Sequence, residues 1–139
     1  GRAETEEKPE VSIKGVHILL AEDNELNMEI AEFMLQNEGA DVTKAWNGRE
    51  AVEIFRKSEP DEFDVILMDI MMPVMNGYEA TKMIRSLERE DAKTIPIIAM
   101  TANAFTEDRL KAKEAGMDEH IAKPVDPELL VKVIYESVD

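Results

Sequence analysis

Residues 65–69 read VILMD, four apolar side chains followed by a carboxylate. A run this short and this continuous is typical of a strand that is buried on both faces. Two further runs have the same character, HILLA at 17–21 and IPIIAM at 95–100. Because strands of this kind occur in parallel sheets with helices on both sides, the three runs predict an α/β fold.

The rest of the chain alternates strand signals with amphipathic stretches. We expect strands at residues 16–21, 41–45, 65–69, 95–100 and 120–122. The intervening stretches predict five helices, which start near residues 24, 48, 78, 106 and 127, the last of them burying Leu129, Leu130, Val133 and Ile134. Right-handed crossovers between parallel strands then give a doubly wound sandwich of five strands and five helices.

Composition limits the classes of function. Residues 1–14 are charged and poor in apolar side chains, so we expect a flexible acidic linker before a domain at 15–139. The 31 acidic and 16 basic residues give a net charge of −15, which disfavours nucleic-acid binding. There is no cysteine, and no apolar run is long enough to cross a membrane. These features favour a cytoplasmic location without direct membrane contact. The initial Gly1 in place of Met suggests a piece of a longer protein or a cloning remnant.

Polar side chains stand where four of the predicted strands end. Glu22 and Asp23 follow the first strand, and Asp69 closes the third. Thr101 follows the fourth strand, and Lys123 follows the fifth. Ligands of doubly wound sheets bind beyond the carboxyl ends of the strands. We therefore expect these five residues to form one site.

The chemistry of such a site follows from its charges. A pair of like charges 4 Å apart costs about 4 kcal/mol at an effective dielectric constant of 20, so three gathered carboxylates need a cation. Oxygen ligands favour Mg²⁺ over zinc. With Lys123 as ammonium and Thr101 as hydroxyl donor, the set would cradle a phosphoryl group, and Asp69 would attack phosphorus.

Each residue taken alone has a simpler interpretation. Asp23 or Asn24 fits the N-cap of the first helix, and Asp69 fits the start of a turn. Thr101 fits a turn cap and Lys123 a solvated surface side chain. The joint placement at four strand ends favours phosphate chemistry over these separate interpretations.

Four segments resemble the receiver domain of two-component response regulators: ILLAEDN at 18–24, DVILMDIMMPVMNGYEA at 64–80, PIIAMTANA at 96–104 and AGMDEHIAKPV at 115–125. The resemblance spans about residues 16–138 and implies a flavodoxin-like sheet of strand order 2-1-3-4-5. NELN at 24–27, PVMNGYEAT at 73–81 and MTANAF at 100–105 are most similar to receivers of hybrid histidine kinases. If the chain is part of such a kinase, the whole protein is a protein-histidine kinase.

The resemblance also implies a role for individual residues around a Mg²⁺ ion. Asp69 is expected to be the phosphoacceptor and a metal ligand. Asp23 is expected to bind Mg²⁺ directly, and Glu22 to act through water. The backbone carbonyl of Met71 is expected to complete the protein's share of the ligands.

The remaining roles concern the phosphoryl group and the switch. Thr101 is expected to hydrogen-bond the phosphoryl group and Lys123 to pair with it. The family usually has Tyr or Phe where this chain has His120, so a switch by Thr101 and His120 would depend on pH. The Lys123–Pro124 bond is similar to one that is cis in this family.

The expected donor is a phosphohistidine on a histidine kinase or on a histidine phosphotransfer protein. Residues 105–137 form the expected output surface, and the oligomeric state, a weak homodimer included, is left open. One alternative is a receiver-like binding module that is never phosphorylated. A second is a Mg²⁺-dependent hydrolase, which would need an acid soon after Asp69, where Ile70 and Met71 offer none.

Overall fold

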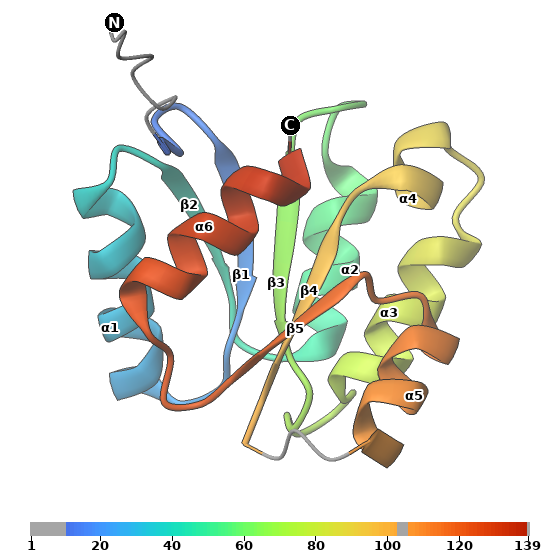
Figure 1. The fold of residues 1–139 in the computed structure, drawn as a ribbon. Helices are drawn as coiled ribbons and strands as arrows, with labels where there is room; N and C mark the ends of the chain where they lie inside the picture. Colours follow the sequence, from blue (N-terminus) through green and yellow to red (C-terminus); the bar gives the residue numbers. More distant parts are fainter. Residues whose placement is uncertain (1–10, 103–105, 139) are drawn as a thin grey trace, which may run out of the picture.

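The computed structural model describes residues 11–102 and 106–138. Five parallel strands form one sheet in the order β2-β1-β3-β4-β5 (Figure 1). The strands are β1 (His17–Ala21), β2 (Asp41–Ala45), β3 (Val65–Asp69), β4 (Ile97–Thr101) and β5 (Glu119–Ala122). The doubly wound sheet and its strand order are thereby confirmed.

Helices fill the connections between the strands: α1 (Glu25–Asn37), α2 (Gly48–Lys57), α3 (Gly77–Ser86), α4 (Glu90–Thr94), α5 (Thr106–Ala115) and α6 (Pro127–Val138). The expectation of five helices was wrong by one, since α4 is an additional helix. Five residues are too few to show a helical period in a sequence, and a helix this short depends on tertiary contacts. Ala92 provides such a contact, because it is fully buried.

The sheet separates two cores. Successive side chains of a strand point to opposite faces. In β1, Leu19 packs with buried residues of α2, α3 and α5, whereas Ile18 and Leu20 pack with α1 and α6. Figure 1 shows α1 and α6 on one face of the sheet and the other helices on the opposite face. Every strand therefore runs through apolar surroundings and ends at one common edge.

Asparagines begin the three helices that leave this edge after β1, β2 and β3. The side chain of Asn24 accepts from the Asn27 backbone, that of Asn47 from Glu50, and that of Asn76 from Glu79. Such caps satisfy backbone N–H groups that a helix leaves without a partner. Since Asn24 caps α1, the carboxylate of Asp23 is left for another role. The side chain of Thr106, at the start of α5, lies outside the described side chains.

Two details differ from expectation. Leu129 was expected to be buried, but 45% of it is exposed, because the buried stripe of α6 runs through Leu130 and Ile134. Ile13 is fully buried in the core shared with α1 and α6, so packing begins inside the stretch expected to be linker. The rest of that stretch, residues 1–10, lies outside the described residues. No helix among the described residues is long and apolar enough to span a membrane.

Candidate functional site

The carboxyl edge of the sheet brings the predicted acidic residues together. Glu22, Asp23 and Asp69 each offer a carboxylate oxygen, and these oxygens lie within 4.8 Å of one another. Glu22 and Asp69 are only 2% and 3% exposed, whereas Asp23 is open to solvent. Lys123 Nζ lies 2.9 Å from Glu22 Oε1 and 3.0 Å from Asp69 Oδ2. Residues that are 101 positions apart in the chain therefore share one small site.

Backbone contacts between neighbouring strands fix this arrangement. The N–H of Glu22 donates to the carbonyl of Ala45 at 3.0 Å, and Glu22 Oε2 accepts from the N–H of Asn24 at 3.0 Å. The N–H of Lys123 donates to the carbonyl of Thr101 at 2.8 Å. Thr101 is itself buried, with 7% of its surface exposed. The ends of β1, β2, β4 and β5 are thus tied together around Asp69.

The electrostatics of the site are unbalanced. Burial raises the pKa of Asp69 to about 6, a shift that Lys123 opposes and Glu22 reinforces. Burial also lowers the pKa of Lys123, but its bonds to Glu22 and Asp69 outweigh this and raise the pKa overall. When all groups are ionised, one ammonium faces three carboxylates. This excess of negative charge, presented by oxygen atoms alone, fits a hard divalent cation such as Mg²⁺.

Two other predicted residues are placed less completely. The side chain of Met71 is 76% exposed, and the role of its backbone carbonyl stays a prediction. His120 lies half-buried on β5 beside Ala99, and its part in a switch also stays a prediction. The Lys123–Pro124 peptide is cis, as the resemblance implied.

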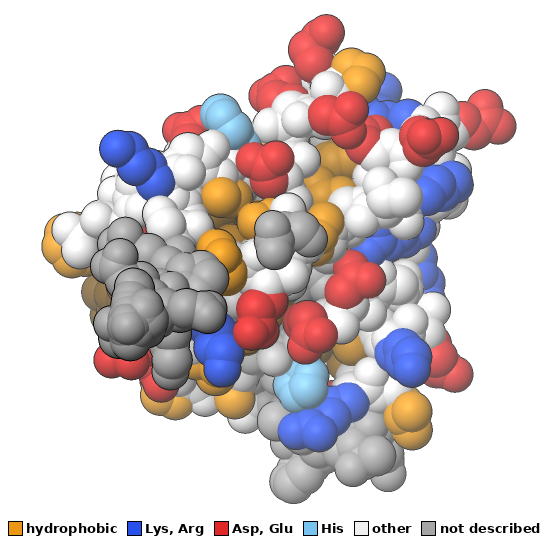
Figure 2. Space-filling model, turned by 45° about the horizontal axis from the view of Figure 1, so that its top comes forward, with side chains coloured by type: hydrophobic (Ala, Val, Ile, Leu, Met, Phe, Trp, Pro, Cys, Tyr) orange, Lys and Arg blue, Asp and Glu red, His pale blue; other side chains and the backbone are white. Residues whose placement is uncertain are grey.

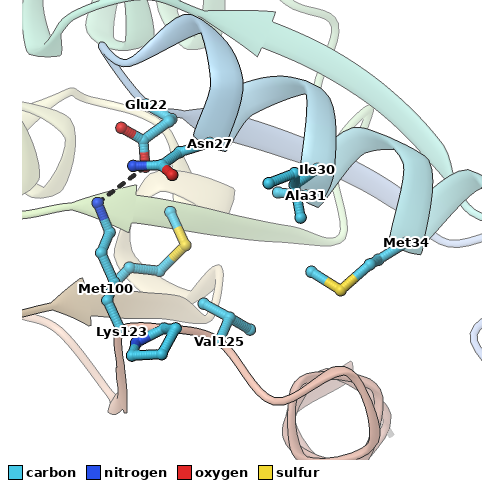
Figure 3. Close-up of a pocket in the computed structure, with 9 residues that line it drawn as sticks. Glu22, Asn27, Ile30, Ala31, Met34, Met100, Lys123 and Val125 are labelled. Atoms are coloured by element: carbon cyan, nitrogen blue, oxygen red, sulfur yellow. Dashed lines mark hydrogen bonds and ion pairs between the residues drawn. The ribbon is translucent and has the colours of Figure 1, made fainter.

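A groove opens beside Lys123, between α1 and the segment that follows β5 (Figure 3). Its volume is about 360 Å³. Figure 3 shows Ile30, Met34 and Val125 around its apolar part, with the contact of Glu22 and Lys123 at its polar end. The groove therefore joins an apolar surface to Glu22 and Lys123, and Lys123 also pairs with Asp69.

The sequence interpretation missed this groove. Ile30, on α1, is 49% exposed and lies outside the packed face of that helix. The buried stripe is instead Met28, Ala31 and Leu35. A second apolar stripe of Leu26, Ile30 and Phe33, at helical spacing, was the available signal, because a helix needs only one such stripe for its core.

In the part of the chain that the structure describes, the acidic composition does not produce a second site of this kind. Figure 2 shows carboxylates spread over one face of the molecule, with lysines and arginines among them. Among the described residues, only Glu22, Asp23 and Asp69 bring three potential metal-ligating groups together. Within the described residues, this cluster is therefore the place where several carboxylates could share one cation.

Comparison with known proteins agrees with this geometry. Residues 18–135 match the family model of the response regulator receiver domain. Over 123 residues, or 87% of the chain, the sequence is 41% identical to hybrid signal transduction histidine kinase I of Dictyostelium discoideum. Histidine kinase 1 of Arabidopsis thaliana is 37% identical and matches 91% of the chain. The chain spans only 7% and 13% of these two relatives.

Solved structures show the same fold. The receiver domain of a sensor histidine kinase from Pseudomonas aeruginosa, with magnesium in its active-site cleft, is 39% identical with a TM-score of 0.81, covering 89% of this chain and 98% of that one. A Saccharomyces cerevisiae receiver domain, crystallised with a histidine phosphotransfer protein, is 32% identical with a TM-score of 0.81, covering 90% of each chain. The chain therefore belongs to the response regulator receiver domain family.

Proposed function

We propose that Asp69 accepts a phosphoryl group from a phosphohistidine, with Mg²⁺ held by Asp23, Asp69, the Met71 carbonyl and, through water, Glu22. One observation carries this proposal: a buried carboxylate lies in ion-pair contact with a lysine and within 4.8 Å of two further carboxylates. Structural ion pairs match their charges, whereas this cluster keeps an excess of anions. That excess is what a site for a cation and a phosphoryl group requires.

The side chains divide the work of transfer. An oxygen of Asp69 forms a bond to phosphorus as the bond between phosphorus and the donor imidazole nitrogen breaks, which leaves an acyl phosphate and a free histidine. Lys123 neutralises one phosphoryl oxygen, and the Thr101 hydroxyl donates to another. Mg²⁺, when bound, neutralises the carboxylates and the oxygens of the incoming group.

The donor reaches Asp69 from the side of α1. We propose that the groove receives the helix that carries the phosphohistidine, either in a kinase or in a phosphotransfer protein. Its apolar wall, through Ile30 and Met34, runs up to Lys123. The yeast relative crystallised with a phosphotransfer protein supports a partner of this class. The hybrid kinases among the relatives support a place inside such a kinase. We also propose a cytoplasmic location for the domain.

Phosphorylation would then act as a switch. It adds about 1.5 to 2 negative charges beside Thr101 and Lys123, which draws both side chains inward. We expect the surface around α5, β5 and α6, with His120 at its edge, to change as a result. Amide chemical shifts recorded with and without beryllium fluoride test this, and unchanged shifts on that surface would contradict it.

Mass spectrometry of the intact chain tests the central step. The chain is mixed with acetyl phosphate and Mg²⁺, and an adduct of about 80 Da is expected. Asp69→Asn should abolish the adduct. Asp41→Asn is the matched control, because Asp41 is an exposed carboxylate at the opposite end of β2 that pairs with His17, and it should leave the adduct unchanged.

The outcome also separates the alternatives. A folded chain that never gains the adduct would favour the binding module. Continuous release of phosphate from a small phosphoester over many turnovers would favour the hydrolase. A single adduct that is lost in Asp69→Asn supports the receiver.

The docking groove has its own test. Ile30→Glu places a charge on the apolar wall of the groove. It should slow phosphoryl transfer from a phosphohistidine partner about tenfold or more, without changing the rate of phosphorylation by acetyl phosphate. Leu110→Glu is the control, because Leu110 is 57% exposed on α5, across the sheet. Equal transfer rates for the two variants would place the donor elsewhere.

A further inference from the structure

The loop between β3 and α3, residues 70–76, carries the expected metal ligand at Met71, and a glycine from another part of the chain holds it. The N–H of Gly48, the first residue of α2, donates to the carbonyl of Met75 at 3.0 Å. A Cβ at position 48 would lie 2.2 Å from that carbonyl oxygen and 3.1 Å from the carbonyl oxygen of Asn76. Only a glycine allows the two backbones to come this close.

The linkage from this contact to Met71 is short and stiff. Met72 is buried, and Pro73 has a fixed φ angle. Val74 has φ +69°, and the N–H of Met75 donates back to the carbonyl of Pro73 at 2.7 Å. A β-branched residue in this region is strained, so the surrounding contacts must hold it there. A displacement of the Met75 carbonyl would therefore also shift Met71, because the residues between them have little freedom to adjust.

The other end of the loop is held as well. The N–H of Gly77 donates to the carbonyl of Ile70 at 2.9 Å. With both ends fixed and a strained residue between them, the loop has one defined course past Asp69. Of these two hydrogen bonds, the one from Gly48 comes from a part of the chain outside both the loop and α3.

We propose that Gly48 is a positioning residue for the metal site: by docking the start of α2 on the Met75 carbonyl, it sets the course of the loop and hence the Met71 carbonyl. This rests on the proposed function, because it presupposes that the site binds Mg²⁺. Gly48 touches none of the acidic residues in the contacts described above. Its effect would be on the affinity for Mg²⁺, and not on the number of ligands.

The test compares two glycine substitutions. Gly48→Ala should weaken Mg²⁺ binding, measured by calorimetry, about tenfold, the usual scale for groups that orient metal ligands. Gly39→Ala is the matched control. Gly39 lies between α1 and β2 with φ +88°, and an added Cβ there would meet Lys14. This variant should therefore lose stability yet bind Mg²⁺ like the parent. Thermal unfolding without Mg²⁺ is recorded for both.

The outcomes are distinguishable. If the parent ignores Mg²⁺, the proposed function fails. If the parent binds Mg²⁺ and Gly48→Ala binds it equally well, the role of Gly48 is overturned. Should Gly48→Ala fail to fold, Val74→Gly decides, since it frees the same loop without a clash: weaker Mg²⁺ binding supports the proposal, and unchanged binding overturns it.

Discussion

Two buried aspartates at opposite ends of the molecule have opposite electrostatics. Asp69 ends β3 at the carboxyl edge of the sheet, and Asp91 lies in α4, just before β4 begins (Figure 1). They are 3% and 8% exposed. Yet the pKa of Asp69 is raised to about 6, and that of Asp91 is lowered to about 2. Two carboxylates with similar exposure can therefore differ in pKa, because burial dominates at Asp69 whereas the hydrogen bonds from Arg89 dominate at Asp91.

Asp91 has a partner for each oxygen. Arg89 donates to Asp91 Oδ1 at 2.7 Å and to Oδ2 at 2.8 Å, and the N–H of Asp61 donates to Oδ2 at 2.9 Å. The same guanidinium donates to the carbonyls of Phe55 and Ser58 at the end of α2, and lies 4.7 Å from the centre of the Phe55 ring. Such bidentate pairing makes this end of the sheet a structural anchor.

Asp69 shares its only described cation with another carboxylate. Lys123 contacts both Asp69 and Glu22, and Asp23 adds a third negative charge nearby. With one ammonium for three carboxylates, the arrangement keeps an excess of negative charge that an added cation would offset. The contrast teaches that one end of the sheet is built for stability and the other for binding.

The largest expected effect comes from Arg89→Ala. It leaves Asp91 buried without its cation and removes donors from the end of α2, so the free energy of unfolding should fall by about 3–5 kcal/mol. Urea unfolding measures this. Arg56→Ala, which breaks the exposed pair with Glu53, is the control and should leave the free energy of unfolding nearly unchanged. Similar losses in the two variants would contradict the structural role of Arg89.

Asp91→Asn should destabilise the fold by roughly 2 kcal/mol at neutral pH. Because the folded pKa of about 2 lies below the usual 3.8, the contribution of the charged form is present above about pH 4. It is lost as the pH falls through 2. The difference between parent and variant should therefore shrink on acidification, and a difference that is constant from pH 6 to 2.5 would refute this.

Asp69→Asn should have the opposite sign, a gain of roughly 1–3 kcal/mol at pH 7. The folded pKa of about 6 lies above the usual 3.8, so the stability contribution of Asp69 is full below about pH 4 and is lost as the pH rises through 6. The gain from the neutral amide should appear over that interval and vanish near pH 4. Urea unfolding across pH 4–7 measures it, and a loss at pH 7 would contradict the account.

Thr81 represents a third case, a buried polar group for which the described structure shows no partner. Its hydroxyl on α3 has no hydrogen bond within the described structure, and the residue is fully buried. Thr81→Val keeps the shape and removes the hydroxyl, so the free energy of unfolding should rise by about 1 kcal/mol. Thermal unfolding measures it, with Ser86→Ala, an exposed position, as control. Destabilisation by the valine would reveal a partner for the hydroxyl.

The sequence predicted the parts of this molecule that depend on local pattern. β2 and β3 begin and end where expected, and the apolar run VILM marks β3 directly. The gathering of Glu22, Asp69 and Lys123 was also predictable, because parallel strands must end at one edge. The features that could not be predicted from the sequence are those set by contacts between distant segments.

Three features illustrate the limit. Helix α4 depends on burial of Ala92 rather than on a period in its own sequence. Asn47-Gly48 was interpreted only as the start of a helix, because nothing local shows that Met75 would approach it. The pKa contrast between Asp69 and Asp91 depends on which cation each one meets in the fold. Each of these features depends on contacts that form only in the folded molecule.

The most direct test follows the carboxyl carbon of Asp69 by ¹³C NMR through a pH titration, with and without Mg²⁺. We predict a pKa near 6 without the ion, because burial raises it and the charge of Glu22 adds to the rise, and a clear fall in that pKa when Mg²⁺ is added. A pKa near the usual 3.8 that does not respond to Mg²⁺ would contradict the central claim that this edge of the sheet is built around an excess of negative charge.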